Sequence, residues 1–276
     1  MGASLGRPGA RHGPEEIRRS ARWNLNRIRE DRVWDVEGGR VVDLSGVEIA
    51  DLGDAEIAAH DTEATFARVE AMVAGAVADG RFPIVLGGDH SISLPPIRAL
   101  AAARERIGIV QLDAHLDLVD FDPRQGSFSQ SSQIRRALEL PQMSPRRLIQ
   151  VGLRGLNYPE MAAFCRQQGI TQLTAAEALD GGAEAVAARC LEVAGADGAA
   201  VYLTLDIDAL DPASAPGAGA HEHGGLTPRF VSELLRRLAP DVDAFDIAEV
   251  NPLFDVQGLT SNLASKLLWD LMLARV

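Results

Sequence analysis

Short apolar runs rich in β-forming residues alternate along the chain with longer amphipathic or alanine-rich runs. Strands and helices that alternate in this way are typical of βαβ units around a parallel sheet. The pattern therefore predicts an α/β protein. The expected strands lie near 46–51, 82–86, 107–112, 147–152, 199–205 and 242–248. The expected helices lie near 14–29, 61–79, 94–104, 131–139, 159–168, 182–194, 227–238 and 260–274.

Two stretches do not fit the alternation. Residues 31–45 predict an exposed hairpin or loop, and 211–227 form the longest irregular stretch, rich in glycine and proline. Long loops inside compact domains usually shape a site. The chain shows no repeat of solenoid length and no linker that would separate domains. We therefore expect residues 1–276 to form a single domain.

Acidic and imidazole side chains follow two of the expected strands. Asp113, His115 and Asp117 alternate directly after Ile-Gly-Ile-Val-Gln-Leu. Asp206 and Asp208 alternate directly after Val-Tyr-Leu-Thr-Leu. In extended backbone, residues two apart point to the same side, so each segment directs its ligands into one space. Five potential metal ligands are thereby gathered at two strand ends.

Two other strand ends carry polar residues as well. His90 follows one strand within Gly-Gly-Asp-His-Ser, and Glu249 and Asn251 follow another. Ligands of open α/β sheets bind beyond the carboxyl ends of the strands, which places all four clusters at one edge. A lone aspartate after a strand is usually a helix cap, the role we assign to Asp89. A lone histidine is more often structural, but converging carboxylates would repel one another without a cation. The sequence therefore predicts a metal site.

The types of ligand indicate which metal this site would hold. Carboxylates with one imidazole for each ion suit hard or intermediate divalent ions better than structural zinc, which thiolates hold. We expect two manganese ions. Two ions bridged by carboxylates would lower the pKa of a bridging water and hold hydroxide at neutral pH. Such a centre is typical of a hydrolase.

Composition narrows the class of protein. The chain is 46% hydrophobic, which indicates a globular protein with a substantial core. It has no apolar run of about 18 residues and no secretion signal, so we expect a cytoplasmic protein without a membrane span. Cys165 and Cys190 do not form the kind of disulfide pattern that stabilises small secreted domains. A net charge of −12 argues against a nucleic-acid partner.

The motifs closely resemble the ureohydrolase family, which includes arginase, agmatinase, guanidinobutyrase and formiminoglutamase. The matching segments are Gly-Gly-Asp-His-Ser at 87–91, Asp-Ala-His-x-Asp at 113–117, Asp-Ile-Asp-x-Leu-Asp-Pro at 206–212, Glu-Val-Asn-Pro at 249–252, and the N-terminal segment 7–14. The resemblance, closest in character to agmatinase, implies an arginase/deacetylase-like three-layer α-β-α sandwich with a mostly parallel central sheet. It also implies a homo-trimer or homo-hexamer.

The resemblance also implies a role for each site residue. One manganese ion would be held by His90, Asp113, Asp117 and Asp206. The second would be held by His115, Asp113, Asp206 and Asp208. Hydroxide between the ions would attack the central carbon of a guanidino group and release urea and an amine. Asp117 would orient the hydroxide and pass its proton to the leaving nitrogen, while Glu249 would bind the guanidinium.

The chain departs from the family pattern in two loops near the expected site. Where relatives carry a Ser-His step, this chain has Ser129-Gln130-Ser131, and glutamine cannot serve as a general acid. Where relatives carry Gly-Thr-Pro-Glu, it has Gly-Ala-His-Glu-His at 219–223. Our hypothesis is that His221 or His223 enters the pocket and supplies the missing acid or a new specificity contact. The alternative is a pair of solvent-exposed loop histidines.

Two other departures concern the chain start and the substrate. The sequence begins at what resembles the end of the family's first strand, which a misplaced start, a truncated sequence or a genuine variant would each explain; if that strand is missing, we expect the sheet to lose a member. After Gly-Leu-Arg at 152–154 it lacks the acidic residues with which arginases hold an α-amino group. We therefore favour agmatine or an ω-guanidino acid as substrate. The alternatives are a formimino or other amidine hydrolase, and a catalytically impaired homologue that binds metal.

Overall fold

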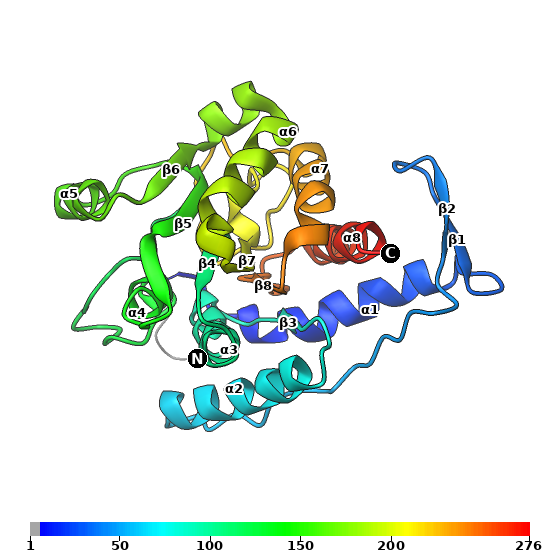
Figure 1. Cartoon of the computed structure of the whole chain (residues 1–276), viewed down its shortest axis with the longest axis horizontal. Helices are drawn as coiled ribbons and strands as arrows, with labels where there is room; N and C mark the ends of the chain where they lie inside the picture. The colour runs from blue at the N-terminus through cyan, green and yellow to red at the C-terminus, as the bar shows by residue number, and fades with distance from the viewer. Residues whose placement is uncertain (1–5) are drawn as a thin grey trace.

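A six-stranded, wholly parallel sheet forms the centre of the computed structural model, which describes residues 6–276 (Figure 1). The strand order is β3-β8-β7-β4-β5-β6. The strands are β3 (Ile84–Leu86), β4 (Ile107–Leu112), β5 (Met143–Leu153), β6 (Thr171–Thr174), β7 (Ala200–Asp206) and β8 (Ala244–Ala248). The helices are α1 (Gly13–Leu25), α2 (Thr62–Ala78), α3 (Leu94–Ala102), α4 (Gln133–Ala137), α5 (Pro159–Gln168), α6 (Ala175–Ala194), α7 (Pro228–Leu238) and α8 (Leu259–Ala274).

Helices cover both faces of the sheet. On one face, α6, α7 and α8 pack against strand residues such as Val110, Leu203 and Phe245. On the other, α2, α3 and α4 pack with strand residues such as Ile109 and Tyr202. The central strands are apolar on both faces because both faces are buried. The predicted three-layer α-β-α sandwich is confirmed, while the single-domain assignment of 1–276 stays a prediction and its first five residues lie outside the described residues.

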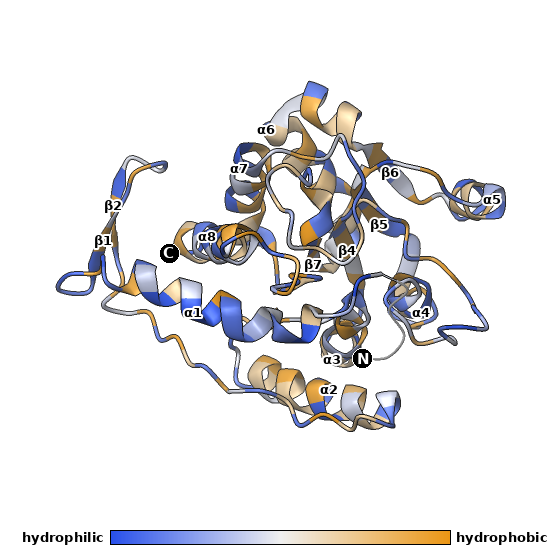
Figure 2. Ribbon diagram, turned by 180° about the vertical axis from the view of Figure 1, so that it is seen from behind, coloured by the Kyte–Doolittle hydropathy of each residue, from blue (hydrophilic) through white to orange (hydrophobic). Residues whose placement is uncertain are grey.

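Local sequence signals explain where several helices begin. Thr174 and Glu177 form a reciprocal capping box at the start of α6, and Thr227 caps α7 directly before Pro228. The helix expected at 182–194 therefore starts earlier, at Ala175, and a positive φ at Gly182 marks a kink within it. Figure 2 shows that α1 is largely hydrophilic, in keeping with a surface position against α8. Within residues 6–276, none of the helices has the length and apolar character needed to span a membrane.

The structure corrects two strand predictions. Residues 46–51 alternate as a strand would, yet they are irregular, and Val47 and Ile49 stay exposed because no neighbouring strand pairs with them. The four-residue β6 was not predicted, since Leu173 is its only apolar residue. The hairpin expected at 31–45 is confirmed as β1 (Arg32–Asp35) paired with β2 (Arg40–Asp43).

Candidate metal centre

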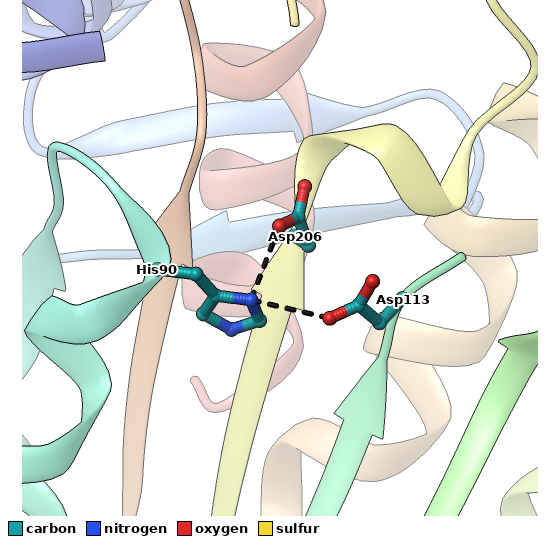
Figure 3. A group of neighbouring side chains, drawn as sticks. All are labelled: His90, Asp113 and Asp206. Carbon is teal, nitrogen blue, oxygen red and sulfur yellow. Dashed lines mark ion pairs between the residues drawn. The ribbon is translucent and has the colours of Figure 1, made fainter. Parts of the chain in front are cut away.

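Strand register brings the predicted ligands together. Leu112 of β4 and Leu205 of β7 are partners, so Asp113 and Asp206, which follow them, end neighbouring strands at one level. His90 arrives from the turn after β3 and begins a short 3-10 helix. All three side chains are buried, and Figure 3 shows them converging on one space. The parallel sheet thus positions three ligands at the carboxyl ends of its strands.

His90 faces three carboxylates with one ring nitrogen. Its Nδ1 lies 3.2 Å from Asp113 Oδ2 and 3.1 Å from Asp206 Oδ2 (Figure 3). Asp117 Oδ2 lies 3.0 Å away. None of these contacts is aligned as a hydrogen bond, and among the described residues the buried Nδ1 has no hydrogen-bond partner. Buried polar atoms are rarely left without a partner, so this nitrogen and the surrounding oxygens fit a cation.

A second group lies beside the first and shares a residue with it. His115 Nδ1 lies 3.4 Å from Asp113 Oδ1 and 3.1 Å from Asp208 Oδ2. Asp113 therefore presents one carboxylate oxygen to each imidazole. In each group, His90-Asp113-Asp206 and Asp113-His115-Asp208, the ligand atoms lie within 4.8 Å of one another. The described residues thus offer two adjacent cation positions bridged by Asp113, whereas Asp206 belongs to the first group only.

Crowding changes the ionisation of these side chains. Burial, followed by the charges of Asp208 and Asp113, raises the pKa of Asp206 well above its usual value. Burial and Asp113 likewise raise the pKa of Asp117, to about 6. Burial alone would lower the pKa of His115, but Asp113 and Asp208 raise it to about 12. Protons therefore favour the positions that metal ions would occupy, and ions would displace them.

Two acidic residues at the site have left-handed backbone. Asp117 has φ 52° and Glu249 has φ 61°, a conformation that costs non-glycine residues energy and clusters at functional sites. Glu249 Oε1 accepts a hydrogen bond from the backbone N–H of His90 at 2.8 Å. Burial, followed by the charge of Asp89, raises the pKa of Glu249 to about 8. A Cβ at Gly219 would lie 2.8 Å from Glu249 Oε2, so glycine allows this loop to approach closely.

Several residues that hold the candidate ligands in place were not predicted from the sequence. Gln111 Nε2 donates a hydrogen bond to Asp113 Oδ2 at 2.7 Å, and the Gln133 side-chain amide donates to Asp117. Arg154 donates to the backbone carbonyl of Asp208 at 2.6 Å. The position of Gln111, two residues before a ligand in an apolar strand, is a signal that could have identified it. Gln133 carries no such signal, because its contact depends on the path of an irregular loop.

A cavity of about 420 Å³ opens above the two groups. Its wall includes Leu156, Tyr158, Met161 and Gln130, the residue that stands where relatives carry a histidine. The buried Oε1 of Gln130 has no hydrogen-bond partner within residues 6–276. The four side chains His90, His115, Asp117 and Glu249 also line it.

The loop histidines do not enter this cavity. Ala220 lines it, but neither His221 nor His223 does. His221 Nε2 is instead 2.9 Å from the Pro216 carbonyl oxygen, a hydrogen bond that holds the ring within its own loop. Contrary to the hypothesis from the sequence, the structure places His221 outside the pocket. Neither loop histidine therefore lines the cavity beside Gln130.

Comparison with known proteins decides the family. The model of the arginase family matches residues 1–274. The chain belongs to the arginase family. The resemblance to ureohydrolases is thereby confirmed, as is the predicted class of hydrolase, which acts on non-peptide C–N bonds of linear amidines.

Several members of the arginase family are similar over most of this chain. A guanidinopropionase of Pseudomonas aeruginosa is 36% identical over 273 residues, which cover 98% of this chain and 82% of the relative. The crystal structure of an agmatine ureohydrolase of Thermoplasma volcanium, 30% identical, superposes with a TM-score of 0.84 and covers 99% of this chain and 86% of that one. The formimidoylglutamase of Bacillus subtilis, 25% identical, has a TM-score of 0.87 and covers 99% and 84%.

Proposed function

We propose that this arginase-family protein hydrolyses a guanidino compound, agmatine or an ω-guanidino acid, to urea and an amine at a centre of two manganese ions. The observation that carries the proposal is the pair of ligand groups that share Asp113 at the base of a 420 Å³ cavity. Their donors are carboxylate oxygens and one imidazole nitrogen in each group, a set that suits manganese. The similarity to a guanidinopropionase and an agmatine ureohydrolase supports the same reaction.

The ligand assignment extends the two groups by Asp117 at the first ion and by a bridging Asp206 at the second, as the family resemblance implies. His90, Asp113, Asp117 and Asp206 would hold the first ion. His115, Asp113, Asp206 and Asp208 would hold the second. When bound, the ions lower the pKa of water and so supply a nucleophile at neutral pH.

The protein's own residues bind the substrate and move its protons. Asp117, beside His90 and at the cavity wall, accepts a proton and transfers it to the leaving nitrogen. The Glu249 carboxylate pairs with the planar guanidinium, a charge-assisted contact. Gln130 also lines the cavity, and its Oε1, which has no hydrogen-bond partner within residues 6–276, would be an acceptor for a substrate with many N–H donors. Leu156, Tyr158 and Met161 enclose the substrate chain and limit the access of water.

A second candidate is the hydrolysis of a formimino or other amidine group. Gln130 favours it, because glutamine stands where relatives carry a loop histidine, and the resemblance implies that some formimino hydrolases also lack that histidine. The two reactions differ in their products, since guanidino hydrolysis gives urea whereas formimino hydrolysis gives formamide. A catalytically impaired homologue would bind manganese and give neither.

A substrate panel tests the proposal. The purified protein is stripped with a chelator, reloaded with manganese and incubated with agmatine, guanidinopropionate, guanidinobutyrate, arginine and formiminoglutamate. Urea from at least one guanidino compound, absent from an Asp208→Asn variant, is the expected result. Formamide alone would select the second candidate. Uptake of manganese without urea, ammonia or formamide would contradict both reactions.

The oligomeric state and the location of the protein stay predictions. The family resemblance implies a homo-trimer or homo-hexamer, and the sequence predicts a cytoplasmic protein. Light scattering after size-exclusion chromatography would test the assembly.

A further inference from the structure

A row of polar residues crosses the sheet directly below the candidate metal centre. Register pairs align these residues on five neighbouring strands: Asp246, Thr204, Gln111, Gln150 and Gln172. They share a face with apolar core residues such as Ile109 and Tyr202. Polar groups in such a layer need hydrogen-bond partners, and here each one finds them within the row or at a metal ligand.

The Gln half of the row ends on a carboxylate. Gln172 donates to Gln150 at 2.8 Å, and Gln150 donates to Gln111 at 2.7 Å. Gln111 in turn donates to Asp113 Oδ2. The donors all point the same way, toward the ligand, as a carboxylate acceptor requires.

The other half of the row runs in the opposite sense, away from an imidazole. The Asp246 carboxylate accepts hydrogen bonds from the Tyr202 hydroxyl and, at 2.7 Å, from the Thr204 hydroxyl. Thr204 has a single hydroxyl hydrogen, and that hydrogen is directed to Asp246. Its oxygen must therefore act as acceptor toward His90 Nε2, which lies 2.8 Å away. The Nε2 nitrogen then carries the ring hydrogen, and Nδ1 presents its lone pair to the space between the aspartates.

We propose that Asp246 and Thr204 are positioning residues of the metal centre. Through the Thr204 hydroxyl, Asp246 fixes the Nε2–H tautomer and the ring orientation of His90, and thereby makes Nδ1 a metal ligand. Metal-binding histidines commonly donate their second N–H to a carboxylate or carbonyl, and here a threonine hydroxyl stands between. The inference rests on the proposed function, since it presupposes a metal at His90.

The hydrogen bonds that link Asp246, Thr204 and His90, here called the relay, act on one ion only. Among the hydrogen bonds and ion pairs of residues 6–276, none joins His115 to Thr204 or Asp246. Its partner Asp208 accepts a hydrogen bond from the backbone N–H of Ala114 instead. A defect in the relay should therefore weaken the ion at His90 and leave the ion at His115 bound. General loosening of the fold would weaken both ions together.

Thr204→Val tests the relay, because valine keeps the shape of threonine and removes the hydroxyl. Isothermal titration of the metal-free protein with manganese should show about 10- to 100-fold weaker binding of one ion and little change in the other. Thr204→Ser, which keeps the hydroxyl, should bind both ions as the unmodified protein does. Two unchanged affinities in Thr204→Val, or equal losses in the valine and serine variants, would overturn the inference.

A double-mutant cycle tests the part assigned to Asp246. If Asp246 acts through Thr204, Asp246→Ala should weaken the ion at His90 in the unmodified protein but add nothing in the Thr204→Val background. Additive losses would overturn the assignment of Asp246. The proposed function can fail independently of this inference. If the unmodified protein bound two ions but released no urea, Thr204→Val would still weaken the binding of one ion only.

Discussion

Oδ1 of Asp113 lies 3.4 Å from Nδ1 of His115, while Oδ2 of the same side chain faces the imidazole of the other ligand group. One carboxylate therefore joins two cation positions. Each position has its own second carboxylate, Asp206 in one group and Asp208 in the other.

Asp113→Asn is expected to weaken both ions, because both depend on that side chain. Asp208→Asn should weaken only the ion at His115. The affinity for each affected ion should fall by more than ~100-fold, the largest loss that a change outside the ligands causes. Metal content after dialysis, measured by plasma emission spectroscopy, checks the stoichiometry. Loss of one ion in Asp113→Asn would contradict the bridging role.

Metal affinity should fall as the pH falls. Because the pKa of Asp206 is raised and that of Asp117 is raised to about 6, these carboxyls hold protons at higher pH than free aspartate does. Manganese needs them deprotonated, so binding releases protons, and releases more at pH 6 than at pH 8. Calorimetry in buffers of different ionisation enthalpy measures this release. Affinity independent of pH, with no proton released, would show that these carboxyls are not ligands.

Gly219→Ala should impair substrate binding without loss of metal. The added Cβ would lie 2.8 Å from Glu249 Oε2 and would push that carboxylate from its place. We expect a higher KM for the guanidino substrate with two ions still bound. Gly46→Ala is the matched control, because a Cβ there meets nothing within 4 Å. An unchanged KM in Gly219→Ala would contradict the role of Glu249 in binding the substrate.

Arg154 is expected to matter for stability as well as for metal binding. Its guanidinium donates to five backbone carbonyls, those of Gly152, Asp208, Ala209, Leu210 and Glu222. Arg154→Met leaves these five acceptors without their donor and should lower the free energy of unfolding by about 5 kcal/mol, at roughly 1 kcal/mol for each carbonyl. Urea unfolding measures the change.

The exposed Arg124 is the control for this substitution, because it pairs only with the neighbouring Asp122 among the hydrogen bonds and ion pairs found in residues 6–276. Arg124→Met should stay within about 0.5 kcal/mol of the unmodified protein. Equal losses of unfolding free energy in the two variants would show that the hydrogen bonds of Arg154 do not stabilise the fold more than those of an exposed arginine.

The positions of the candidate metal ligands could be predicted from the sequence because their signal is local. Asp113 and His115 follow an apolar run at a spacing of two, and a parallel sheet places such strand ends at one edge. The adjacency and register of β4 and β7, which bring the two acidic segments to one level, are shown by the structure and not by the local pattern.

The supporting contacts could not be predicted because they depend on register and loop paths. Thr204 and Asp246 occur in separate apolar strands, and only the pairing of β7 with β8 shows that they meet. The loop motif led us to expect His221 in the pocket, but the hydrogen bond to the Pro216 carbonyl keeps its ring within the loop. Residues 46–51 had the alternation of a strand and lacked a partner strand, which the local pattern does not reveal.

Anomalous diffraction at the manganese edge, from crystals grown with manganese, tests whether two ions share Asp113. We expect two peaks, one beside Nδ1 of His90 and one beside Nδ1 of His115, with Asp113 in contact with both. A site without peaks, or a single peak away from Asp113, would contradict it.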